Sequence, residues 1–143
     1  MRATPVVAGE SDRTLGYLLL RLTIGASLFG HGLVRMPKLD AFHAQLVGEF
    51  KTSMLPVALV SACAYVLPFA ELITGVLLLA GLLTRAAAVA AVMLMIVLVL
   101  GATSIEHFTV IGEQLIHASM LAGVVAFRKY DKYSVDRLLA ARH

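Results

Sequence analysis

Residues 86–105 form an uninterrupted apolar stretch, AAAVAAVMLMIVLVLGATSI, that contains no ionisable side chain. About 20 residues in an α-helix span roughly 30 Å, which is the thickness of the hydrocarbon core of a bilayer. The stretch therefore predicts a transmembrane helix. The alternative is a buried helix of a soluble bundle, but 143 residues are too few to bury this stretch and several similar ones beneath a polar surface.

The composition supports a membrane protein and excludes several kinds of site. Hydrophobic residues make up 59% and charged residues 15% of the chain, whereas soluble domains have about 45–50% and 25%. The net charge is +3, but the basic residues adjoin apolar stretches and form no patch with aromatic side chains, so we expect no nucleic-acid partner. Cys63 is the single cysteine, which excludes an internal disulfide, a CxxC redox pair and a cysteine zinc site.

The apolar segments predict an all-α fold, an integral membrane four-helix bundle. Residues 15–127 are expected to form one domain, with helices at about 15–34, 55–83, 86–103 and 108–127. Residues 1–14 and 128–143 are expected to be a polar N-terminal tail and a basic C-terminal tail. Between the first two helices, residues 41–50 predict a short amphipathic helix at the membrane interface.

The distribution of lysine and arginine predicts the orientation of this bundle. One side holds Arg2, Arg13, Arg85, Arg128, Lys129, Lys132, Arg137 and Arg142. The loops on the other side hold only Arg35, Lys38 and Lys51. Because cytoplasmic segments carry the excess of basic residues, both termini are expected to be cytoplasmic.

The first two predicted spans each contain one charged residue, Arg21 in the first helix and Glu71 in the second. A central charge costs about 2.5 to 3.5 kcal/mol on insertion scales, so we expect the two to pair. Such a pair is consistent with two interpretations. It fixes the register of two helices, or it belongs to a polar pocket that binds the head group of a small lipophilic molecule such as a quinone.

The last predicted helix is the polar one and supplies further candidates. Glu113 and His117 are four residues apart and share a face. Their spacing differs from the Glu-x-x-His pairs of di-iron bundles, so we expect no metal site. With His31 they complete a candidate cofactor-binding set: Arg21, His31, Glu71, Glu113 and His117. Glu71 and His117 are the catalytic candidates because they can exchange protons; a haem held between His31 and His117 is an alternative to a quinone.

Three segments give the chain a family resemblance: RLTIGASLFGHGLVRM, PFAELITGVLLLAGLLTRAAA and YSVDRLL. Over residues 21–139 the chain resembles the DoxX family of small four-helix membrane proteins. The resemblance maps onto Arg21, Gly25, His31, Gly32, Pro68, Glu71, Gly75, Gly81, Thr84, Arg85, Ser134 and Asp136. Two departures are Arg35, where such proteins usually carry lysine, and the segment FRKYDKYSVD, which replaces a glycine-rich approach to the tail.

The resemblance implies a multi-pass protein of a prokaryotic plasma (inner) membrane and a link to quinone-dependent oxidation, because the family includes subunits of thiosulfate:quinone oxidoreductases. We therefore expect a subunit or accessory of a quinone-linked membrane oxidoreductase. The chain carries no nucleotide, flavin or iron–sulfur motif, so a redox role depends on a bound cofactor or a protein partner. The alternatives are a non-enzymatic scaffold or assembly protein with a structural Arg–Glu pair, and a transporter built as a homo-oligomer.

Overall fold

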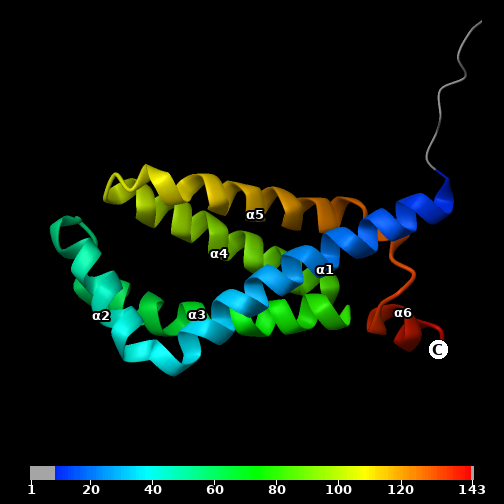
Figure 1. Cartoon of the computed structure of the whole chain (residues 1–143), viewed down its shortest axis with the longest axis horizontal. Coiled ribbons are helices and arrows are strands. Elements are labelled where there is room, and N and C mark those ends of the chain that lie inside the picture. Colours follow the sequence, from blue (N-terminus) through cyan, green and yellow to red (C-terminus); the bar gives the residue numbers. More distant parts are fainter. Residues whose placement is uncertain (1–8, 143) are drawn as a thin grey trace, which may run out of the picture.

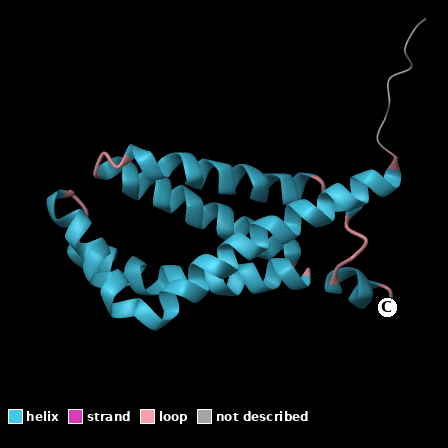
Figure 2. Cartoon of the chain, viewed as in Figure 1, coloured by secondary structure: helices cyan, strands magenta, loops and turns pink. Residues whose placement is uncertain are grey.

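The computed structural model describes residues 9–142, and in that part of the chain helices joined by short loops are the only regular secondary structure, without a strand. Figures 1 and 2 show long helices running side by side and a short helix beside the C-terminus. The α-helices are α1 (Glu10–Arg35), α2 (Leu39–Glu49), α3 (Val57–Ala80), α4 (Thr84–Ser104), α5 (Phe108–Ala126) and α6 (Val135–Ala140). Single 3-10 turns lie at Met36–Lys38, Phe50–Thr52 and Arg128–Tyr130.

Four helical segments, which include α1, α3, α4 and α5, are long and apolar enough to cross a membrane. The predicted all-α fold is therefore confirmed, whereas the insertion and the cytoplasmic position of both termini stay predictions. The exposed surface is rich in large apolar side chains: Leu19, Leu33, Val66, Ile73, Met93 and Leu100 are all at least half exposed. Such a surface suits contact with lipid.

Two helix boundaries differ from the sequence expectation. Helix α1 begins at Glu10 and not near residue 15, because Asp12 accepts a hydrogen bond from the Gly9 N–H (3.2 Å) and favours the helix N-terminus. The expected N-terminal tail is thus helical from Glu10, and residues 1–8 lie outside the described part. Helix α3 ends at Ala80 and not near residue 83, because Gly81 takes a left-handed conformation with φ +67° and so terminates the helix.

Helices α1 and α3 pack against each other through glycines. A Cβ added to Gly32 would lie 2.5 Å from the Leu72 nitrogen, and one added to Gly75 would lie 2.3 Å from the Phe29 nitrogen. The two backbones therefore touch at a distance that only glycine allows, as in other membrane helix pairs. This contact fixes the register of the antiparallel pair.

The second pair is α4 with α5, and alanines on α4 allow its close approach. Ala87, Ala88 and Ala91 are buried and join Leu121 and Val124 of α5 in the core. Figure 1 shows α1 passing beside the end of α5 near its own N-terminus and then crossing toward α3, while α2 lies at the far end of the molecule.

Candidate functional site

A cavity of about 500 Å³ lies in the half of the bundle that carries α2. Its walls come from the second half of α1, from α2, from much of α3, from the end of α4 and from the start of α5. Most lining side chains are aliphatic or aromatic, and the polar ones include His31, Arg35, Glu71, Glu113 and His117. Four of the five residues in the expected cofactor set thus line one cavity, and Arg21 does not.

The partner of Glu71 is Arg35. Glu71 is only 3% exposed, and its Oε2 accepts a hydrogen bond from Nη1 of Arg35. The guanidinium of Arg35 also lies 4.8 Å from the centre of the Phe42 ring, a favourable cation–π distance. The predicted pair of Arg21 with Glu71 is therefore wrong. The positive charge comes from Arg35, which the sequence had led us to place in a loop.

The register of the two helices explains this correction. Gly32 of α1 contacts Leu72 of α3, and Gly25 contacts Leu79. In an antiparallel pair with that register, Glu71 lies level with the residue after Gly32, and Arg35 follows within about half a turn of that level. Arg21 lies nearly three turns away, at the level of Gly81.

Arg21 belongs to a separate polar cluster at the opposite end of the bundle. Its side chain is 2% exposed, and its Nη2 donates to the Tyr133 carbonyl at 2.6 Å. A Cβ on Gly81 would lie 1.8 Å from Nη1 of Arg21, so the missing side chain of Gly81 makes room for the guanidinium. Arg21 thereby ties the segment after α5 to the turn between α3 and α4.

Asp136 completes this connection. Its two carboxylate oxygens accept hydrogen bonds from the backbone nitrogens of Leu83 (2.8 Å) and Thr84 (2.9 Å), and its own N–H donates to the Gly81 carbonyl at 2.9 Å. Burial opposes ionisation of Asp136, but the hydrogen bonds from Thr84 and Leu83 prevail and hold the pKa of its carboxyl below the usual value of 3.8. The C-terminal segment is accordingly docked on the bundle and caps the start of α4.

His31 and His117, the two histidines of the predicted membrane spans, lie side by side in the cavity. The ring centres of His31 and His117 are 5.7 Å apart. His117 uses both nitrogens: Nδ1 is 2.7 Å from the Glu113 carbonyl, and Nε2 is 2.8 Å from the Ser27 hydroxyl. Because a carbonyl only accepts, Nδ1 carries the proton, and Nε2 of the neutral ring accepts from Ser27. His31 has no hydrogen bond to any described side chain or backbone group, so its ring faces the cavity with its nitrogens free.

The polar side chains of the cavity fit a quinone better than a haem. Axial haem ligation needs a free nitrogen on each histidine, and Ser27 already occupies Nε2 of His117. The haem alternative therefore does not fit the donor set. Among residues 9–142 no group of three or more His, Cys, Asp or Glu side chains is placed to hold a metal ion. The free donors of Arg35 and His31 suit a ligand with carbonyl oxygens.

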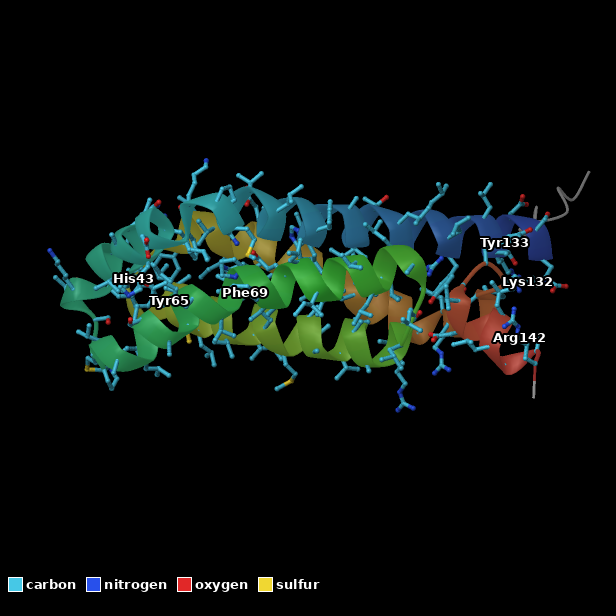
Figure 3. All side chains as sticks on the ribbon, turned by 90° about the horizontal axis from the view of Figure 1, so that it is seen from below. His43, Tyr65, Phe69, Lys132, Tyr133 and Arg142 are labelled. Carbon is cyan, nitrogen blue, oxygen red and sulfur yellow. The ribbon has the colours of Figure 1, made fainter. Side chains whose placement is uncertain are left out.

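Helix α2 closes one side of the cavity and is held by a polar contact with α3. Nε2 of His43 lies 2.6 Å from the Ser61 hydroxyl, and the His43 ring stacks on Tyr65 with ring centres 4.6 Å apart. Figure 3 shows these two side chains together at the α2 end of the molecule, with Lys132 and Tyr133 at the other end. The short helix expected at residues 41–50 is present and extends over Leu39–Glu49, whereas its position at the membrane interface stays a prediction.

Sequence reasoning missed several residues of this cavity, including Arg35, Phe42 and Gln114. Arg35 was assigned to a loop because the predicted helix ended at residue 34, whereas α1 continues through it. One signal was present, since Arg35 occupies a position at which the resembling family usually has lysine.

Comparisons with known proteins identify one family. The family model for DoxX matches residues 16–111 of the chain, which includes Arg35, Glu71 and His31. Its match ends within α5, before His117 and before the docked C-terminal segment. No curated protein and no solved structure matches the chain.

Proposed function

The chain belongs to the DoxX family, and from this premise we propose that its cavity binds the head group of a membrane quinone and that the protein serves as a subunit of a quinone-linked membrane oxidoreductase. The observation that carries the proposal is the Arg35–Glu71 pair in the wall of an apolar cavity. Ligand pockets of about 300–1,000 Å³ with mostly apolar walls and a few polar groups are typical small-molecule sites.

The chemistry of the lining residues suits a quinone ring. The ring is apolar, and its two carbonyl oxygens accept hydrogen bonds, which Arg35 and His31 can donate. Leu59 and Leu100 line the cavity and are 51% and 66% exposed, so the cavity wall continues into the lipid-facing surface. A lipophilic ligand with an isoprenoid tail can thus enter from the bilayer without passing through water.

A quinone supplies a two-electron, two-proton couple when bound, and its electrons must come from a partner subunit, since the chain has no redox motif of its own. The residues of this chain provide binding and protons. In this proposal Glu71 holds the Arg35 guanidinium in place, and His31 exchanges protons with a quinone oxygen. His117, held by Ser27 and Glu113, positions the neighbouring ring of His31.

The second candidate function is a membrane scaffold or assembly protein whose ion pair is structural. The observation in its favour is that Arg35 already has two partners, Glu71 and the Phe42 ring. A pair that only fixes helix register should tolerate reversal of its charges. A ligand site should not tolerate it, because reversal moves the donor away from its place in the cavity.

A charge-reversal experiment separates the two functions. The double variant Arg35→Glu with Glu71→Arg is reconstituted in lipid, and both its unfolding midpoint and its binding of a short-chain quinone are measured. The oxidoreductase proposal expects the unfolding midpoint to recover relative to either single variant while quinone binding stays lost. Recovery of the unfolding midpoint in a protein whose wild type binds no quinone would favour the scaffold.

A further inference from the structure

A second hollow, of about 350 Å³, lies at the end of the molecule opposite the cavity, and its lining includes Arg128, Lys129, Asp131, Asp136 and Arg137. We propose that this hollow binds the phosphate-bearing head group of an anionic phospholipid. The proposal is independent of the quinone site, because the two sites share no residue.

The hollow is built on a fixed surface and not on a loose tail. Arg128 and Lys129 form a 3-10 turn directly after α5. The chain is then held by the bond from Arg21 to the Tyr133 carbonyl and by the bonds of Asp136 to the start of α4. The three basic side chains are thereby brought to one place before any ligand is present, which lowers the entropic cost of binding.

The two acidic residues of the hollow differ in their contacts. Both oxygens of Asp136 accept backbone N–H groups, whereas Asp131 is 5% exposed and its carboxylate has no hydrogen bond to the described residues. The two arginines keep free donors, whereas the Lys129 ammonium lies 5.0 Å from the centre of the Tyr130 ring. Arg137 uses its Nε on the Asp131 carbonyl at 2.7 Å, and its two terminal nitrogens bond to none of the described residues. Arg128 has no hydrogen bond to the described part of the chain and is exposed.

Guanidinium groups bind phosphate oxygens with paired N–H donors, and a nearby ammonium adds a point charge. Arg128, Arg137 and Lys129 supply this combination. Their placement directly beyond the membrane-spanning part of α5 also matches the position at which basic pockets contact anionic head groups.

Exposed apolar side chains close in sequence to the lining residues indicate a lipid as the source of the phosphate. Phe127 is 53% exposed, Tyr133 is 66% exposed and Leu138 is 67% exposed. Figure 3 shows Tyr133 beside Lys132 at this end of the molecule. Aromatic and aliphatic side chains next to basic ones are typical of the membrane interface, where they contact the acyl region while the charges contact head groups. Free phosphate would make no use of these residues.

The test uses the full chain in nanodiscs of phosphatidylcholine with increasing phosphatidylglycerol, and native mass spectrometry counts the retained phosphatidylglycerol. The hollow variant is Arg128→Ala, Lys129→Ala, Arg137→Ala. Its matched control, Lys38→Ala, Lys51→Ala, Arg142→Ala, removes the same number of charges elsewhere. We expect the hollow variant to bind phosphatidylglycerol at least about tenfold more weakly and the control to bind it within about twofold of wild type.

The proposal is overturned if both triple variants lose the lipid equally, if phosphatidylcholine is retained as tightly, or if inorganic phosphate binds the protein in detergent while phosphatidylglycerol does not. An unfolding midpoint measured in pure phosphatidylcholine shows whether the hollow variant is folded. If it is not, the single variant Arg128→Gln decides in its place, because the exposed Arg128 side chain makes no described hydrogen bond. Its binding must fall measurably below that of Arg142→Gln.

Discussion

Arg35, the last residue of α1, donates a hydrogen bond to Glu71 in the middle of α3. The two residues differ in burial: the Glu71 side chain is 4% exposed and the Arg35 side chain 30%. The Glu71 carboxylate therefore depends on Arg35 for stabilisation, because little solvent reaches it. This asymmetry has a direct consequence for variants at the two positions.

Loss of Arg35 should destabilise the protein more than neutralisation of Glu71. Arg35→Ala leaves a buried carboxylate without a partner, and removing one member of such a pair costs on the order of 3 kcal/mol. Glu71→Gln keeps a hydrogen-bonding group and removes the buried charge, so the unfolding free energy should fall by less. Unfolding in mixed micelles with increasing SDS measures both values. Glu10→Gln is the control, because its bridge to Lys132 is exposed at both ends and should contribute little to stability.

Gly81 is expected to tolerate no side chain. In Gly81→Ala the new Cβ would meet the guanidinium of Arg21 at 1.8 Å, and the residue would keep a φ of +67°. We expect the C-terminal segment to detach, so that limited proteolysis cleaves the region of residues 128–142 faster. Gly112→Ala is the matched control, since nothing lies within 4 Å of its added Cβ and alanine favours a helix. Equal cleavage rates in the two variants would contradict this account of the docking.

The docking of the same segment should depend on pH through Asp136. Its folded pKa is lowered from 3.8, so its contribution to stability is fully present above pH 3.8 and is lost as the pH falls through the lower, folded pKa. The difference in unfolding midpoint between wild type and Asp136→Asn should thus be constant at neutral pH and should shrink only below pH 3.8. A difference that changes between pH 5 and pH 8 would show that another group controls the docking.

The fold was largely predictable from the sequence, because the length of each apolar stretch and the positions of the charged residues indicate the long helices. Residues 86–105 lack ionisable groups, and α4 occupies Thr84–Ser104. The end of α3 was predicted less well, because Gly81 stops that helix within an otherwise apolar run. A left-handed C-cap is a local backbone property that a hydropathy pattern does not report.

Four of the five residues predicted for the site line the cavity, but Arg21 does not, and the predicted ion pair was wrong. Glu71, His31, Glu113 and His117 were recognised as polar residues at membrane depth, and the cavity contains all of them. Arg21 was wrongly predicted as the partner of Glu71. The position of a residue along its own helix does not reveal the register of that helix against a neighbouring one. That register depends on where Gly32 and Gly75 allow α1 and α3 to touch. The contact of Arg21 with Tyr133, which is 112 positions away, has no periodic signal in the sequence.

Quinone binding in the cavity can be tested by filling the cavity without changing the ion pair. Cys63 lines the cavity, so Cys63→Trp should occupy the space of a quinone ring, whereas Met93→Trp adds the same side chain at a position that is 56% exposed on α4. Native mass spectrometry of protein purified in mild detergent and supplied with a short-chain quinone measures the bound fraction. The quinone proposal predicts binding by wild type and Met93→Trp and loss in Cys63→Trp; equal binding by all three, or binding by none, would contradict it.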